Sequence, residues 1–163
     1  MYEILGNVGD FLGGVGVLVT LVYLAIQIRQ NTNSARAATY QAATAALSEW
    51  TSAIGRDPVA TGIFMRGSQN PEQLNETEHA QFSLLTVSIL RHYENIHFQY
   101  SSGALDPGTW EGWASRMHGN VATPGTKAIW QGQRTAFSSE FRAFIDAGLV
   151  AAESKTNLPW SDD

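Results

Sequence analysis

The sequence contains no cysteine among its 163 residues. Without thiols there is no cysteine nucleophile, no thiolate metal site and no disulfide framework. The cellular compartment stays open, because a bacterial protein can lack cysteine on either side of a membrane. The absence of cysteine therefore excludes three kinds of chemistry and leaves the location of the protein to other features.

Charged residues are also scarce. They make up 15% of the chain, whereas a typical soluble domain has about 25%. Fifteen Asp and Glu residues outnumber ten Lys and Arg residues, so the formal net charge is −5. Contact with nucleic-acid phosphates needs clustered cations, and we expect no nucleic-acid partner. So few charges suit a protein whose surface lies largely in lipid or against other proteins.

Signatures of catalysis are missing as well. The sequence has no nucleophile elbow, phosphate loop or dinucleotide fingerprint. Gly13, Gly14 and Gly16 lie inside an apolar run, which is the wrong context for a phosphate loop. We expect no cofactor, and an enzymatic function is the less favoured interpretation.

A long apolar run is the most distinctive feature that is present. Phe11 to Ile28 reads FLGGVGVLVTLVYLAIQI and contains no charge. A helix of this length spans about 27 Å, close to the ~30 Å hydrocarbon core of a bilayer. Its apolar character goes all round the helix, which argues against a core helix with one buried stripe. No basic residue precedes it, which argues against a cleaved signal peptide. The run predicts one transmembrane helix.

The flanking charges predict an orientation for this helix. No Lys or Arg precedes the run, and Arg29 and Arg36 follow it. Positive residues favour the cytoplasmic side of a membrane. We therefore expect the N-terminus outside and the following domain in the cytoplasm.

Small residues recur along one side of the predicted membrane helix. Gly9, Gly13, Gly16 and Thr20 share a face on which helix backbones can approach closely. This face predicts packing against a second copy or another membrane helix. The alternative is that glycine is simply common in membrane helices.

The rest of the chain predicts an all-α fold, because no alternating strand pattern appears. The first helix continues beyond the membrane and ends at Gly55, with an apolar stripe of Tyr40, Ala43, Leu47, Trp50 and Ile54. Later helices are announced by capping residues and prolines. These signals are Asp57-Pro58 with a stop at Gly67, Asn75 with Glu78 for a helix to about Tyr100, Asp106-Pro107, Thr123-Pro124, and Ser138 or Ser139.

We therefore expect one N-terminal transmembrane helix that continues into an irregular helical bundle. The expected divisions are an anchor helix over residues 1–30, a helical soluble domain over 31–153 and a polar tail over 154–163.

Several motifs together resemble one group of bacterial proteins. The first is VTLVYLAIQIRQNT, Val19 to Thr32, followed by Ala38-Thr39-Tyr40-Gln41. Later ones are RHYEN from Arg91 with Gln99-Tyr100, WEGW from Trp110, and FSSEFR from Phe137. The chain resembles a broad, uncharacterised family of short bacterial proteins. Its members open with a membrane helix ending in an IQIRQNT-like signature and continue as a helical domain. The resemblance implies this architecture and no activity.

One pair of residues is a candidate metal site. Glu94 and His97 have the Glu-x-x-His spacing of carboxylate-bridged di-metal bundles. Such sites need a second pair and further glutamates, and the chain has no second Glu-x-x-His. A homodimer could supply the second copy, with facing carboxylates such as Glu49. An ion pair between Arg91 and Glu94 within one helix is the simpler interpretation.

Aromatic residues are concentrated after Asp106. Trp110, Trp113 and Trp130 could form a surface that anchors a partner, because tryptophan is favoured at binding hot spots. They could instead belong to the core of short helices or lie at a membrane interface.

Three functions remain from the sequence. The favoured one is a single-pass membrane-anchored interaction or scaffold protein, which forms a homo-oligomer or serves as an accessory subunit of a membrane complex. The second is a metal- or small-ligand-binding bundle with an enzymatic or sensory role. The third is an oligomeric pore lined by the first helix.

Overall fold

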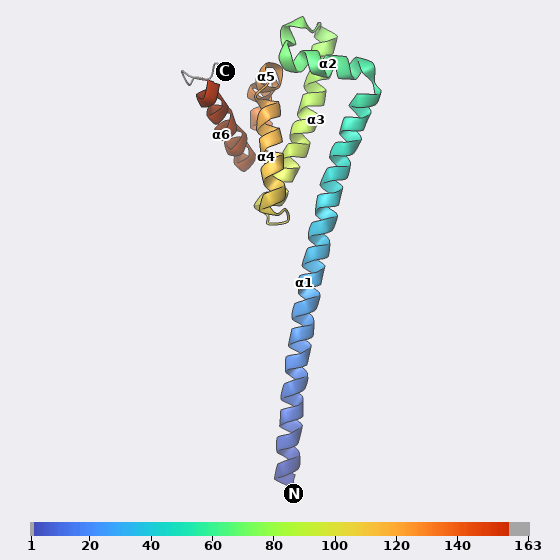
Figure 1. Cartoon of the computed structure of the whole chain (residues 1–163), viewed down its shortest axis with the longest axis vertical. Coiled ribbons are helices and arrows are strands. Elements are labelled where there is room, and N and C mark those ends of the chain that lie inside the picture. The colour runs from blue at the N-terminus through green and yellow to red at the C-terminus, as the bar shows by residue number, and fades with distance from the viewer. Residues whose placement is uncertain (1, 157–163) are drawn as a thin grey trace. The chain divides into compact units, whose positions relative to one another are not determined.

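The fold is all-α, as expected. The computed structural model describes the backbone of residues 2–156 and the side chains of residues 13–154. Within that backbone no strand is present. The elements are α1 (Tyr2–Arg56), α2 (Pro58–Gln69), the 3₁₀ turn η1 (Pro71–Gln73), α3 (Glu76–Ser101), α4 (Pro107–Val121), α5 (Pro124–Gln133), the 3₁₀ turn η2 (Arg134–Ala136) and α6 (Ser139–Thr156) (Figure 1).

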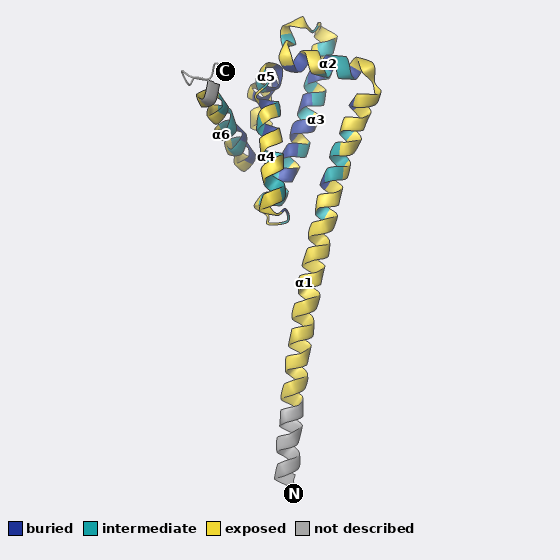
Figure 2. Ribbon diagram, in the orientation of Figure 1, coloured by how far each residue is buried: buried dark blue, intermediate teal, exposed yellow. Residues whose placement is uncertain are grey.

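The chain divides into two compact units, Met1–Ala38 and Thr39–Asp163. The sequence placed this division after residue 30. In the first unit every described residue, 13–38, is exposed, as Figure 2 shows. The second unit contains all the buried residues of the described chain and is called the helical domain below. Helix α6 extends to Thr156 and so includes the first three residues of the expected polar tail; the rest of that tail, 157–163, lies outside the described residues.

Helix α1 is a single helix of 55 residues, as the absence of proline predicted. It does not stop at Gly55, which lies inside the helix. The interruption comes from Asp57, whose Oδ1 accepts hydrogen bonds from the backbone N–H groups of Val59 (2.9 Å) and Ala60 (3.2 Å). This side chain caps α2, so the next helix starts at Pro58, with Asp57 alone between the two helices.

The expected stop of α2 at Gly67 is also wrong, because α2 continues to Gln69. Gly67 is buried inside the helix, and a Cβ there would lie 2.5 Å from the Phe82 ring on α3. A Cβ on Gly125 of α5 would collide with the carbonyl oxygen of Gly67. These two glycines therefore allow a close approach of helices and do not end one.

The starts of the later helices agree with the capping signals. Asn75 and Glu78 form the predicted capping box of α3. Asp106 Oδ1 accepts the backbone N–H of Thr109 (3.0 Å) at the start of α4. Thr123 precedes α5 but its hydroxyl does not cap it; it donates to the carbonyl oxygen of Asn120 (2.9 Å). The cap-plus-proline pattern thus located α4 and α5, although only Asp106 acts as a cap.

Helix α3 is the centre of the helical domain, since it contacts α2, α4, α5 and α6. Its predicted apolar face is fully buried at Phe82, Ile89, Tyr93 and Ile96, whereas Leu85 and Tyr100 are half-buried. The last part of α1 packs on the main core through residues of the predicted stripe: Ala43, Leu47 and Trp50. The largest fully buried side chain is Trp130 on α5.

Candidate functional site

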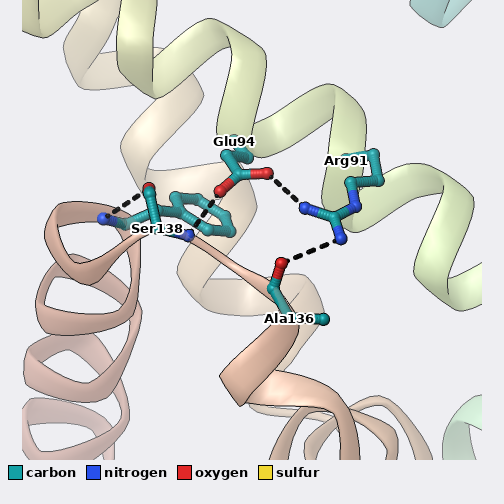
Figure 3. A network of polar contacts seen from close by, with 5 residues as sticks. Arg91, Glu94, Ala136 and Ser138 are labelled. Atoms are coloured by element: carbon teal, nitrogen blue, oxygen red, sulfur yellow. Dashed lines mark hydrogen bonds and ion pairs between the residues drawn. The ribbon is translucent and has the colours of Figure 1, made fainter.

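A network of polar contacts joins α3 to the start of α6 (Figure 3). The Glu94 carboxylate accepts the backbone N–H of Ser138 (2.7 Å) and a guanidinium N–H of Arg91 (2.7 Å). Arg91 also donates to the carbonyl oxygen of Ala136 (2.9 Å), and its guanidinium lies 4.2 Å from the centre of the Phe137 ring. The predicted Arg91–Glu94 ion pair is therefore confirmed.

The surroundings of Glu94 favour its ionised form. Partial burial opposes ionisation, but the hydrogen bonds from Ser138 and Arg91 outweigh it and hold the pKa of Glu94 below its ordinary value. The charge lies at the N-terminus of α6, where a negative group is stabilised by the helix dipole and unpaired N–H groups. Glu94, on α3, therefore acts as a cap at the N-terminus of α6.

His97 lies one turn further along α3, in a cluster of aromatic rings. Its imidazole is 5.0 Å from the Phe144 ring, 5.6 Å from Trp110 and 5.7 Å from Phe141, measured between ring centres. Burial lowers the pKa of His97, while the charges of Glu140 and Glu94 act in the opposite direction. The neutral imidazole is therefore favoured, packed as an aromatic group.

The structure thus gives Glu94 and His97 different surroundings. Both oxygens of Glu94 are engaged by protein donors, and the described contacts of the His97 imidazole are with aromatic rings. Among residues 13–154 no three His, Asp or Glu side chains gather as a metal ion would need. The carboxylate of Glu49, on α1, is exposed.

The three tryptophans after Asp106 have different environments. Trp130 is fully buried, and its indole N–H donates to Asp146 Oδ1 (3.0 Å). The other carboxylate oxygen, Asp146 Oδ2, pairs with Arg134. Trp130 therefore belongs to the core, and its assignment to a partner surface is wrong. Trp110 is half-buried and stacks on Tyr100, with 4.4 Å between ring centres.

Trp113 borders an open hollow on the surface of the helical domain. The hollow has a volume of about 380 Å³ and is lined also by Tyr40, Thr109, Gly112 and Arg116. Arg116 also interacts with the buried Tyr93 of α3. Burial raises the pKa of Tyr93, although the charge of Arg116 and hydrogen bonds with Arg116 and Asn120 act in the opposite direction.

The small-residue face of α1 can be followed only in part, because Gly9 lies outside the residues whose side chains are described. Gly13 and Gly16 are exposed, and a Cβ on either would meet nothing within 4 Å. The Thr20 hydroxyl donates to the carbonyl oxygen of Gly16 (2.8 Å). The polar group of this face is thus satisfied within the helix, which leaves the face apolar and shallow.

A groove between α4 and α6 was not anticipated from the sequence. It has a volume of about 490 Å³, and most of its lining residues are small. The signal was present, since Ser115 and Gly119 are four residues apart, as are Gly148 and Ala152. This spacing places each pair on one side of a helix. Only the packing of α4 on α6 brings the two pairs together.

No protein-family model, curated protein or solved structure matches the chain.

Proposed function

We propose that the protein is a single-pass membrane-anchored helical interaction protein, which self-assembles or joins a larger membrane complex through its anchor and its helical domain. The observation that carries the proposal is the exposure of every residue from 13 to 38, including the charge-free run to Ile28. The described part of α1, Gly13–Arg56, is long and apolar enough to cross a membrane.

The exposed apolar surface favours lipid over water as the surroundings of this segment. The side chains of Val17, Leu18 and Ile28 are 61%, 63% and 66% exposed. Each Å² of apolar surface left in water forgoes about 25 cal/mol. In a bilayer the same surface is solvated by acyl chains, and the helix satisfies its own backbone groups.

The polar side chains of the segment are compatible with a bilayer. Thr20 donates to its own helix, and the Gln27 amide donates to the Tyr23 hydroxyl (3.3 Å). Such internal hydrogen bonds reduce the cost of placing these groups near lipid. Tyr23 is also a residue type favoured at membrane–water interfaces.

The proposed orientation has the helical domain in the cytoplasm. It is supported by Arg29 and Arg36, which follow the apolar run and are both exposed. The resemblance to short bacterial proteins with an IQIRQNT-like signature supports membership of that family and a bacterial inner membrane.

The membrane proposal is tested by expressing the full chain with a C-terminal tag and extracting membranes with alkaline carbonate. We expect the protein to stay in the pellet, and the tag to be digested by protease only after the inner membrane is opened. Recovery in the carbonate supernatant would refute the anchor. Digestion of the tag from the periplasmic side, with the protein still in the pellet, would refute the orientation alone.

Assembly through the small-residue face is tested by native mass determination in nanodiscs. The Gly13→Leu substitution removes the close approach at this face, and we expect the oligomer mass to fall. Gly14→Leu is the matched control, because it adds the same side chain on another side of the helix and its Cβ is equally unobstructed. Gly9→Leu extends the test along the predicted face. Equal masses for the Gly13 and Gly14 variants would exclude this face as the contact.

A further inference from the structure

The hollow beside Trp113 lies within the helical domain, between α4 and the part of α1 that belongs to the domain. Its volume is about 380 Å³, and it is lined by Thr109, Gly112, Trp113 and Arg116 on α4 and by Tyr40 on α1. The residues on α4 are three or four positions apart, so they share one face of the helix. Pockets for small ligands have volumes of about 300–1,000 Å³. The hollow therefore has room for a small molecule.

Arg116 gives the hollow a positive charge. Among residues 13–154 the ion pairs with carboxylates are formed by Arg66, Arg91, Lys127 and Arg134, so Arg116 takes part in none of them. A guanidinium has five N–H donors in a planar fork, which fits the oxygens of a phosphate or carboxylate. Arg116 can therefore pair with an anionic ligand.

A buried tyrosine restrains this arginine. The Tyr93 side chain on α3 is 1% exposed and shares a hydrogen bond with Arg116. Asn120, one turn later on α4, is hydrogen-bonded to the same tyrosine. A restrained side chain loses less conformational freedom when it binds a ligand. One bond to Tyr93 also leaves other N–H donors of the guanidinium for the hollow.

The other walls of the hollow are aromatic or polar. Trp113 packs against the main core and is half-buried, and Tyr40 is 45% exposed. Such rings offer flat surfaces on which another ring can stack. The Thr109 hydroxyl is a possible donor to an oxyanion. The Asp106 carboxylate, ten residues before Arg116, accepts the backbone N–H of Thr109 at the start of α4 and forms no ion pair with the guanidinium.

We propose that this hollow binds a small soluble molecule in which a phosphate or carboxylate is attached to a flat ring. Arg116 pairs with the anionic group, and the ring packs against Trp113 and Tyr40. The aromatic walls favour such a molecule over a glycerophospholipid headgroup without a flat ring. The inference goes beyond the proposed membrane function, and it stands whether or not α1 crosses a membrane, because it concerns the helical domain alone.

The test uses the full chain labelled with 5-fluorotryptophan, held in phosphatidylcholine nanodiscs and observed by fluorine NMR. Trp113→Phe and Trp130→Phe identify the two signals that matter. Phenyl phosphate and benzoate are the probes, and we expect at least one to shift the Trp113 signal saturably while the signal of the fully buried Trp130 stays in place. A Trp113 signal that neither probe moves saturably overturns the proposal.

The two halves of each probe separate the roles of charge and ring. Inorganic phosphate and acetate carry the anion alone, and phenol carries the ring alone. We expect each half to bind at least about tenfold more weakly than the whole probe. Equal affinity for the anion alone would refute the role of the aromatic walls, and equal affinity for phenol would refute the role of Arg116.

A charge substitution connects the signal to the guanidinium. Arg116→Gln should weaken binding of the probe by about tenfold or more, because it removes the ion pair. Arg56→Gln is the matched control, since Arg56 is also an exposed arginine of the helical domain and does not line the hollow. Equal affinities of these two variants would overturn the proposal.

A second variant blocks the hollow without touching the contact between Arg116 and Tyr93. A Cβ on Gly112 would meet nothing within 4 Å, so Gly112→Leu places a side chain in the open space, and we expect the Trp113 signal to stop responding to the probe. Gly132→Leu on α5 is the control, because its Cβ is equally unobstructed and it does not line the hollow. The Trp130 signal reports that each variant is folded, and an unchanged response of folded Gly112→Leu overturns the proposal.

Nanodiscs that contain phosphatidylglycerol distinguish a soluble ligand from a lipid. We expect the titration of the Trp113 signal to be the same in these nanodiscs. A Trp113 signal that phosphatidylglycerol has already shifted, and that the probe no longer moves, would show a lipid headgroup in the hollow and would overturn a soluble ligand. Carbonate extraction tests the anchor separately, and a protein recovered in the supernatant is titrated in buffer.

Discussion

The two units of this chain differ in how far they bury aliphatic side chains. Leu18 and Ile28 on the first part of α1 are more than 60% exposed, whereas Ile89 and Ile145 of the helical domain are 1% and 0% exposed. All are aliphatic residues in helices. The difference teaches that apolar content does not specify burial in protein; what matters is whether a second element covers the surface.

Helix α1 contains this contrast within itself. Its first described residues are exposed on every side, and its last turns have one buried stripe that includes Ala43 and Ile54. An apolar surface all round a helix suits lipid, and a single stripe suits a protein core. The change of pattern along one helix thus marks the change of surroundings.

The largest effect is expected from truncating the central tryptophan of the helical domain. Trp130→Ala leaves a cavity where a fully buried side chain was, and removes the hydrogen bond to Asp146. We expect the free energy of unfolding of the domain to fall by about 3–5 kcal/mol, measured by urea denaturation followed by circular dichroism. Leu18→Ala on the exposed part of α1 should leave this transition unchanged. A similar loss in both variants would abolish the contrast between the units.

A charge placed in the anchor should have a smaller but distinct effect. Leu18→Arg puts a guanidinium near the middle of the apolar run, at a cost of about 2.5–3.5 kcal/mol for membrane insertion. We expect a clear shift of the protein into the carbonate supernatant, with an unchanged unfolding transition of the domain. Ser34→Arg, beyond the apolar run, is the control and should stay in the membrane pellet.

Glycines sharpen the comparison, because Gly67 and Gly125 of the helical domain are obstructed, whereas Gly13 of the first unit and Gly132 of the domain are open. Gly125→Ala forces a Cβ against the carbonyl oxygen of Gly67, and we expect a loss of about 1–3 kcal/mol from the displacement of α2 and α5. Gly132→Ala, later on α5, meets nothing and should stabilise the domain by about 0.5–1 kcal/mol. Gly13→Ala should not alter the unfolding of the domain. Equal effects at Gly125 and Gly132 would contradict the close approach.

The smallest expected effect concerns the Glu94 network. Glu94→Gln weakens the charge-assisted hydrogen bonds to Ser138 and Arg91. Arg91 is half exposed, so we expect a loss of only about 1 kcal/mol at neutral pH. Glu111→Gln, on the exposed side of α4, is the control.

The same network predicts a pH dependence. The pKa of Glu94 is lowered in the folded state, so its contribution is complete well above the unfolded pKa of about 4.3 and is lost as the pH falls through the folded pKa. The stability difference between the natural protein and Glu94→Gln should therefore shrink below about pH 4. A difference that stays constant from neutral to acid pH would show that the Glu94 charge does not stabilise the junction.

The sequence located helix starts better than helix ends. Asp57, Asn75 and Asp106 were recognised because a cap acts within three residues of itself, so local pattern is sufficient. Gly55 and Gly67 were misjudged as stops because a glycine has two uses, and the choice between them depends on remote residues. For Gly67 the deciding neighbour is Phe82, on another helix.

The candidate site shows the same limit. The Arg91–Glu94 pair was predictable, since its members are one helical turn apart. The contact of Glu94 with the Ser138 N–H joins residues 44 positions apart, and the groove joins α4 with α6. Neither has a local signal, because the residues meet only after the helices have packed.

By itself, the sequence determined the all-α class, the continuity of α1, the capped helix starts and a charge-free apolar run of bilayer length. Each of these follows from interactions between residues a few positions apart. Only the tertiary structure decided that Trp130 belongs to the core, that Glu94 caps a second helix and that small residues of α4 and α6 form a groove. Those features depend on which helices pack together, and packing depends on shape complementarity that local pattern does not contain.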